Sequence, residues 1–336
     1  MKVAQALPWT QPVSDRIIQQ YAKQRLGHAL LLVGQEGVGK RLLLRELSQF
    51  LLCTDQQQGP CGQCGSCHLF NAGSHPDLLM VEPEEKGKQI KIEQVRKVTE
   101  FVNTTAQRGH SKVVLLGPAE AMNVNASNAL LKSLEEPSAN ITLLLYSHQP
   151  SGLLATIKSR CQQFPVYGPN FNQALTWLQQ NSEAELSEPA ANSVLRLASG
   201  APLKALDMIE QDVHVQYMQF CQNMMDLQNR QVQWNELLTK WKNWDMQNIL
   251  QWFYGLLLDA QKQKAGLVDA QALSMLELAA QTQQVAQRAQ YGQIEQALQK
   301  LTESQQAYRG QANPNPTMMT ESLLIDWLAL LGQSAH

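Results

Sequence analysis

The chain has 336 residues, with 27 lysines and arginines against 29 aspartates and glutamates. This length predicts two or three domains, because single hydrophobic cores stop growing near ~250–300 residues. The balanced charge excludes the strongly basic surface that drives binding to a phosphate backbone, so strong DNA binding by the chain alone is not expected. The sequence shows no signal-peptide pattern at its start and no apolar run near the ~20 residues that span a bilayer. We therefore expect a cytoplasmic protein without membrane attachment.

From residue 29 to about residue 166, short apolar runs alternate with helical patterns. This alternation is typical of a parallel sheet with crossover helices. Strands are expected at residues 29–33, 77–82, 112–116, 141–146 and, as a short last segment, 162–166. Helices are expected at residues 41–52, 91–103 and 125–136, the last of them stopped by Pro137.

The pattern changes after the turn at residues 167–170. Long stretches rich in Gln, Leu, Ala and Trp follow, without alternating strand patterns, and they predict helices. We expect an α/β domain at 1–166 that contains a cysteine-rich loop at 53–67. A small helical lid at 167–207 and an all-helical domain at 208–336 are expected to follow it.

The stretch GQEGVGKR, which begins at Gly34, has the spacing of a phosphate-binding P-loop up to its last position. Gly34, Gly37 and Gly39 allow the backbone to curl so that N–H groups face a phosphate, at the positive end of the following helix. Lys40 stands where the lysine of this motif reaches the β- and γ-phosphates. Arg41 replaces the Ser or Thr hydroxyl that binds Mg²⁺, so the site lacks one group that hydrolysis requires.

A second requirement for ATP hydrolysis is an acidic pair at the end of a later strand. The strand expected at 112–116 is followed by Gly117 and Pro118, and the nearest carboxylate, Glu120, comes two residues late. The two losses point the same way and predict a loop that does not hydrolyse ATP. A glycine-rich turn that only connects strand and helix is at least as well supported as nucleotide binding, and both readings stay open.

Four cysteines cluster within fifteen residues after the P-loop helix, at Cys53, Cys61, Cys64 and Cys67. In a reducing cytosol such a cluster indicates metal ligands before disulfides. Four thiolates in a glycine-rich loop suit a closed, structural Zn²⁺ site, because no coordination position is left for catalysis. Two alternatives are that His68 or His75 replaces one cysteine, and that the thiols are reduced and unliganded.

With these features together, the chain resembles the delta-prime subunits of the bacterial DNA polymerase III clamp loader, which belong to the AAA+ family. The match rests on LLVGQEGVGK, the cysteine loop followed by GSHPDLLMVEP, NALLKSLEEPSANITLLL and SRCQQF, in this order over about residues 1–166. The helical remainder fits the lid and collar domains of that family. The resemblance implies a P-loop NTPase-like AAA+ sheet domain with a zinc-binding insertion, followed by a small lid and an all-α collar.

The resemblance also implies a function. Such subunits assemble with delta and with three gamma or tau subunits into a pentamer that places the beta sliding clamp on primer-template DNA. The chain would then not be catalytic on its own, but a subunit of a DNA-directed DNA polymerase, a nucleotidyltransferase. Arg160, in Ser159-Arg160-Cys161, matches the arginine finger that reaches the ATP of a neighbouring subunit. Without the resemblance, Arg160 would be interpreted as an ordinary surface arginine.

Departures from active members of the family fit a defective site. Leu203 and Lys204 stand in the segment that bears a nucleotide-sensing arginine in active members. Two other functions remain as alternatives: an autonomous gamma-type ATPase in which Glu120 and some other hydroxyl substitute for the missing groups, and a zinc-containing module that binds DNA directly. Lys40 leaves open whether a nucleotide is held without being cleaved.

Overall fold

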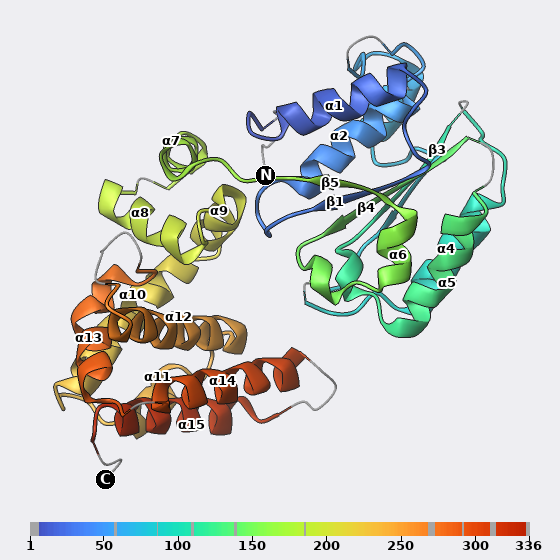
Figure 1. Cartoon of the computed structure of the whole chain (residues 1–336). Coiled ribbons are helices and arrows are strands. Elements are labelled where there is room, and N and C mark those ends of the chain that lie inside the picture. The colour runs from blue at the N-terminus through green and yellow to red at the C-terminus, as the bar shows by residue number, and fades with distance from the viewer. Residues whose placement is uncertain are drawn as a thin grey trace. The chain divides into compact units, whose positions relative to one another are not determined.

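The structure is a computed structural model, and the chain divides into two compact units (Figure 1). The N-terminal unit comprises Met1–Ala174 with Ala201–Lys204, and the C-terminal unit comprises Leu175–Gly200 with Ala205–His336. The residues described are 7–56, 59–85, 87–108, 111–137, 140–184, 186–267, 273–290, 292–309 and 314–333.

The N-terminal unit is built on a five-stranded sheet in which every pairing is parallel. The strands are β1 (Ala29–Val33), β2 (Leu78–Val81), β3 (Lys112–Leu116), β4 (Ile141–Ser147) and β5 (Gln162–Pro165). Their order is β2-β3-β4-β1-β5, so the strand that leads into the P-loop lies inside the sheet, between β4 and β5. The parallel sheet expected from the sequence is confirmed, and the short last segment forms the edge strand β5.

Helices cover both faces of this sheet, because alternate residues of each strand point to opposite sides. Leu30 and Leu32 of β1 pack in one core with α1 and α2, and Leu31 packs in the other core with α4, α5 and α6. The helices are α1 (Gln11–Ala22), α2 (Lys40–Leu52), α4 (Ile92–Val102), α5 (Val124–Glu135) and α6 (Ala155–Arg160). Figure 1 shows α1 and α2 on one side of the sheet and the other three helices on the opposite side. The P-loop lies at the carboxyl ends of the strands, between β1 and α2.

All regular elements among the described residues of the C-terminal unit are helices. Its elements are α8 (Glu188–Leu197), α10 (Val213–Gln228), α11 (Trp234–Lys240), α12 (Met246–Lys264), a 3₁₀ turn η4 (Leu276–Leu278), α13 (Ala279–Arg288), α14 (Gln293–Arg309) and α15 (Pro316–Leu330). Two further helices, α7 (Phe171–Asn181) and α9 (Pro202–Glu210), cross the division between the units. Phe220 packs against Trp241 and Trp252 with ring centroids 5.2 Å apart, so these tryptophans belong to a core. The all-helical C-terminal region expected from the sequence is confirmed.

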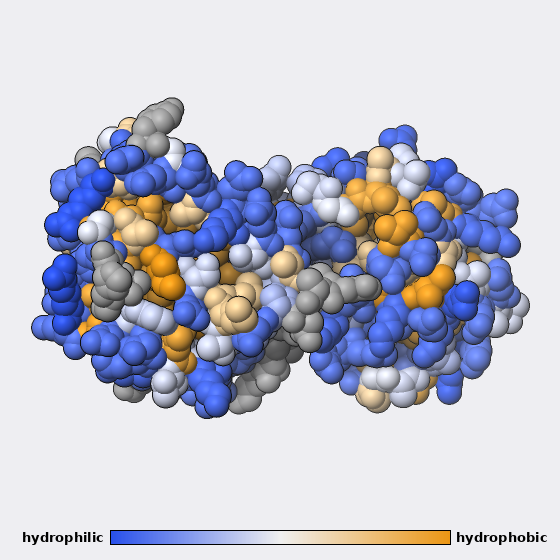
Figure 2. Space-filling model, turned by 90° about the horizontal axis from the view of Figure 1, so that it is seen from below, coloured by the Kyte–Doolittle hydropathy of each residue, from blue (hydrophilic) through white to orange (hydrophobic). Residues whose placement is uncertain are grey.

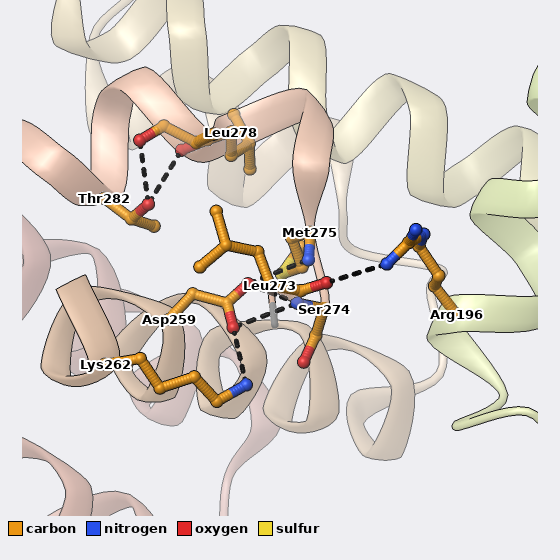
Figure 3. A network of polar contacts seen from close by, with 9 residues as sticks. Arg196, Asp259, Lys262, Leu273, Ser274, Met275, Leu278 and Thr282 are labelled. Carbon is orange, nitrogen blue, oxygen red and sulfur yellow. Dashed lines mark hydrogen bonds and ion pairs between the residues drawn. The ribbon is translucent and has the colours of Figure 1, made fainter. Parts of the chain in front are cut away.

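A buried carboxylate orders the turn before α13 (Figure 3). Asp259 of α12 is fully buried and accepts hydrogen bonds from the backbone N–H groups of Ser274 and Met275, each at 2.8 Å, while Lys262 lies 3.1 Å away. Arg196 of α8 donates to the Leu273 carbonyl in the same network. Because a buried charge is costly without partners, these donors hold the turn against α12 and connect it to α8.

On the face drawn in Figure 2, hydrophilic residues surround small groups of apolar ones. Of the helices in the described ranges, none combines the length and the apolar character that crossing a bilayer requires.

Candidate functional site

The P-loop connects β1 to α2 and is packed against the rest of the N-terminal unit. Gly37 and Gly39 have φ angles of +79° and +99°, which favour glycine. A Cβ atom on Gly37 would lie 2.5 Å from Cβ of Lys204, and one on Gly39 would lie 2.3 Å from Cδ1 of Leu7. The Trp9 indole also donates to the Val38 carbonyl at 2.8 Å. Gly37 and Gly39 thus adopt backbone conformations that require glycine, and neighbouring side chains lie close against the loop.

Lys40 is turned into the loop. Its ammonium donates to the carbonyls of Gly34 and Gln35, each at 2.6 Å, and the residue is only 2% exposed. Burial lowers the pKa of this ammonium to about 8. The lysine that a phosphate would attract is thus already bonded to the backbone of its own loop.

Arg41 is engaged in a cluster that the sequence analysis did not identify. Its Nε and Nη2 atoms lie 2.5 and 2.7 Å from the two carboxylate oxygens of Glu82, which follows β2, and the Tyr146 hydroxyl donates to Glu82 at 2.9 Å. The hydrogen bond to Glu82 raises the pKa of Arg41, and burial beside the same carboxylate raises the pKa of Tyr146. A fork-shaped pair of this kind orients the guanidinium firmly. A cation is therefore placed where the motif would place a Mg²⁺ ligand.

The Tyr146 ring also occupies the space beside the end of β3. A Cβ atom on Gly117 would lie 2.6 Å from ring carbons of Tyr146, far inside van der Waals contact. No carboxylate fits at this position unless the ring moves. A tyrosine in β4 thus closes the space that an acidic residue after β3 would need.

Glu120 is committed to a structural task. Its Oε1 atom accepts hydrogen bonds from the backbone N–H groups of His148 and Gln149, at 2.8 and 3.2 Å, and so caps the turn after β4. Its other oxygen is buried without a hydrogen-bond partner. Burial and the nearby Lys40 ammonium lower the pKa of His148, which keeps this imidazole neutral. Glu120 is therefore poorly placed to replace a missing catalytic carboxylate.

The four cysteines converge at the other end of α2. The sulfur atoms of Cys53, Cys61, Cys64 and Cys67 all lie within 4.8 Å of one another, with 3.8 Å between Cys53 and Cys64 and 4.0 Å between Cys61 and Cys67. Four thiolates about 2.3 Å from a tetrahedral Zn²⁺ would be ~3.8 Å apart. The observed spacing fits such an ion.

Backbone N–H groups point at the sulfur atoms of this cluster. Cys61 N lies 3.4 Å from Cys53 Sγ, Cys64 N lies 3.3 Å from Cys61 Sγ, and Cys67 N lies 3.4 Å from Cys64 Sγ. A hydrogen bond with Thr54 lowers the pKa of Cys64 to about 5, whereas burial raises the pKa of Cys67 to about 12. The donors compensate for thiolate charge, and a divalent cation would replace the remaining protons.

The alternative ligand His75 has other partners. It is buried, its Nε2 atom lies 2.6 Å from the Ser66 hydroxyl, and its Nδ1 atom accepts from the Asp77 N–H group at 3.1 Å. Both ring nitrogens are thus occupied in packing the loop against β2. The metal-binding group that the described residues form consists of cysteines alone.

Arg160 ends α6 on a well-anchored backbone. Ile157 is fully buried and Cys161 is 8% exposed, so the residues around Arg160 are fixed in the core. The Arg160 side chain is 34% exposed and forms an ion pair with Glu135, while its Nη1 atom donates to the Thr156 carbonyl at 3.0 Å. Within the described part of the chain, the polar partners of Arg160 are Glu135, Thr156 and Ser159, all of which lie outside the P-loop. The predicted site residues thus form three separate groups: the P-loop, the cysteine cluster and Arg160.

A parallel sheet with a glycine-rich loop between β1 and α2 defines a P-loop NTPase-like domain. Two family models match the chain, "DNA polymerase III, delta subunit" over residues 9–169 and "DNA polymerase III, delta subunit, C terminal" over residues 211–329. The chain belongs to the family of DNA polymerase III delta-prime subunits, as its curated relatives show.

Two of these relatives match over most of their length. The DNA polymerase III subunit delta-prime of Pseudomonas aeruginosa is 37% identical over 98% of this chain and 99% of that protein. The corresponding subunit of Escherichia coli is 36% identical over 77% of each chain. A solved structure, a gamma subunit-related protein of DNA polymerase III from Thermotoga maritima, is a distant likeness at 17% identity and a TM-score of 0.48, covering 95% of this chain and 99% of that one.

Proposed function

We propose that this protein is a non-hydrolysing subunit of the clamp loader that serves DNA polymerase III. The observation that carries the proposal is the filled P-loop end of the sheet. Arg41 is paired with Glu82 where a Mg²⁺ ligand would be needed, and Tyr146 blocks the acidic position after β3. A delta-prime family member with such a site is suited to brace a ring of subunits rather than to cleave ATP.

In this function the useful group is Arg160. Buried neighbours hold its backbone, and its guanidinium is partly exposed, as a group that must reach another subunit requires. At a head-to-tail interface the guanidinium would stabilise the charge that develops on the γ-phosphate of a neighbour's ATP. The neighbours would be gamma or tau and delta subunits, and the assembled ring would act on the beta clamp and primer-template DNA in the cytoplasm.

The cysteine cluster would hold one Zn²⁺ ion through Cys53, Cys61, Cys64 and Cys67. The observation that supports this is the agreement of the sulfur spacing with a tetrahedral site, together with the N–H groups directed at the sulfurs. With four sulfur ligands the ion has no open position, so it would stabilise the loop and take no part in catalysis.

The test of the finger is Arg160→Ala in a reconstituted clamp loader. Turnover at the neighbour's site should fall by ~10³-fold or more. In pre-steady-state measurements of ATP hydrolysis by the whole complex, the burst should then lose the amplitude that this one site contributes. Lys158→Ala is the matched control, because it removes a cation from the same helix. Normal hydrolysis by the Arg160 variant, in a complex of normal composition, would remove the proposed role.

Two measurements on the isolated chain distinguish this function from its alternatives. An autonomous ATPase would show Mg²⁺-dependent hydrolysis that Lys40→Ala abolishes, and we expect none. A zinc-containing DNA-binding module would bind primed DNA tightly at ~150 mM salt, whereas we expect weak, salt-sensitive binding. Fluorescence anisotropy with labelled DNA measures the difference.

A further inference from the structure

The Arg160 guanidinium has two short contacts within its own subunit, besides a long one of 3.5 Å to the Ser159 hydroxyl. Nη2 forms an ion pair with the carboxylate of Glu135, the last residue of α5, and Nη1 donates to the Thr156 carbonyl at 3.0 Å. These contacts approach the guanidinium through two different nitrogens. They therefore fix the orientation of its plane and not merely its position.

The two helices that meet at this pair are locked together. Leu130 and Leu134 of α5 share one core cluster with Ile157 of α6 and with Cys161, and Ile157 is fully buried. The backbone positions of residues 135 and 160 are therefore set by the core. The remaining freedom lies in the Arg160 side chain, which has many rotamers unless a partner selects one.

The pair is also exposed enough to be exchanged. The Arg160 side chain is 34% exposed and that of Glu135 is 48% exposed, so water screens their attraction. Glu135 therefore binds the guanidinium weakly enough to be exchanged for another anion. A triphosphate from a neighbouring subunit carries more charge and could displace it without a change of backbone.

We propose that Glu135 is a positioning residue for Arg160. It favours the rotamer from which the guanidinium exchanges Glu135 for the ATP of the neighbouring subunit. This inference rests on the proposed role of Arg160 as an arginine finger. Glu135 acts through Arg160 and touches no reacting atom. Its removal should reduce the fraction of complexes in which the finger is correctly oriented, and should leave the binding of ATP to the neighbour unchanged.

The experiment is a double-mutant cycle in the reconstituted complex, with Glu135→Gln, Arg160→Ala and the double variant. Single-turnover hydrolysis at the neighbour's site should slow about fivefold in Glu135→Gln, with an unchanged KM for ATP. In the Arg160→Ala background the same substitution should have no further effect, because Glu135 acts only through the arginine. Glu136→Gln, which removes the adjacent charge, is the matched control.

The outcomes separate the two proposals. If Arg160→Ala slows hydrolysis but Glu135→Gln does not, the finger stands and the positioning role is overturned. If the two effects simply multiply in the double variant, Glu135 acts by another route and the positioning role is again overturned. If Arg160→Ala itself leaves hydrolysis unchanged, both proposals fail. Gel filtration and thermal unfolding of each variant show whether the ring is intact.

Discussion

The two ends of helix α2 carry two motifs with opposite outcomes. At its N-terminal end, the P-loop keeps its glycines and Lys40, but Lys40 and Arg41 are bonded to groups of the same chain. At its C-terminal end, from Cys53 onward, the thiols converge on one another, and backbone N–H groups point at the sulfurs. A ligand would have to displace protein contacts at the first end and would complete the contacts at the second. The difference shows that what a motif can bind depends more on the contacts of its side chains than on its residue types alone.

The strongest test of this comparison is the removal of one sulfur ligand. Cys64→Ser should lower the zinc content of the purified protein from about one ion per chain to nearly none, since structural zinc requires its full ligand set. The loop should then exchange its amide hydrogens much faster, as local folding is coupled to the metal. Zinc analysis and hydrogen exchange over residues 59–71 provide the two measurements.

Cys161→Ser is the control for this variant, because Cys161 is a buried thiol outside the cluster. It should keep its zinc even if it lowers overall stability. Wild-type protein that is purified without chelator and contains no zinc would contradict the assignment.

A second test fills the space beside Gly117. Gly117→Ala should lower the free energy of unfolding by about 2 kcal/mol, because the new methyl group would lie 2.6 Å from the Tyr146 ring. Gly152→Ala is the matched control, since its new atom would meet only Glu120 Cβ at an ordinary 3.6 Å. In a Tyr146→Ala background the cost of Gly117→Ala should shrink. An equal cost for both glycines in urea unfolding would show that the ring does not close this space.

Features encoded in adjacent residues could be predicted from the sequence, whereas contacts between distant residues could not. The strand ALLLV and the cysteine spacing were predictable because their signals lie within a few adjacent residues. Helix α1 was not predicted, although Val13, Ile17 and Tyr21 recur every four residues and pack on the core, so its helical pattern was present in the sequence. The pairing of Arg41 with Glu82 joins residues 41 positions apart, and only the assembled sheet brings them together. The sequence did contain two hints of this pair: Arg41 stands at a position where the motif has Ser or Thr, and Glu82 places a carboxylate at the end of β2.

A third test uses the pH dependence of stability. The pKa of Lys40 is lowered to about 8 in the folded protein and is about 10.4 in an unfolded chain, so the unfolded state binds the proton more tightly between these values. The contribution of Lys40 to stability therefore rises with pH in this range. Relative to Lys40→Met, the wild-type protein should gain on the order of 2 kcal/mol between pH 7.5 and 9.5. Parallel stability curves from denaturant unfolding would mean that Lys40 is solvated and free to meet a phosphate.

The smallest effect is expected when the Ser or Thr of the P-loop motif is restored at position 41. Arg41→Thr would return the hydroxyl of an active P-loop and would break the pair with Glu82. Because the Arg41 side chain is 51% exposed, the stability cost should stay below about 1 kcal/mol. No Mg²⁺-dependent ATP turnover should appear in the isolated chain, since Lys40 remains bonded to its loop and Tyr146 still fills the acidic position. Turnover well above that of the wild-type chain, measured by phosphate release, would show that one side chain had silenced an otherwise competent site. Arg41 alone, and not the other contacts of the P-loop, would then account for the difference between the two ends of α2.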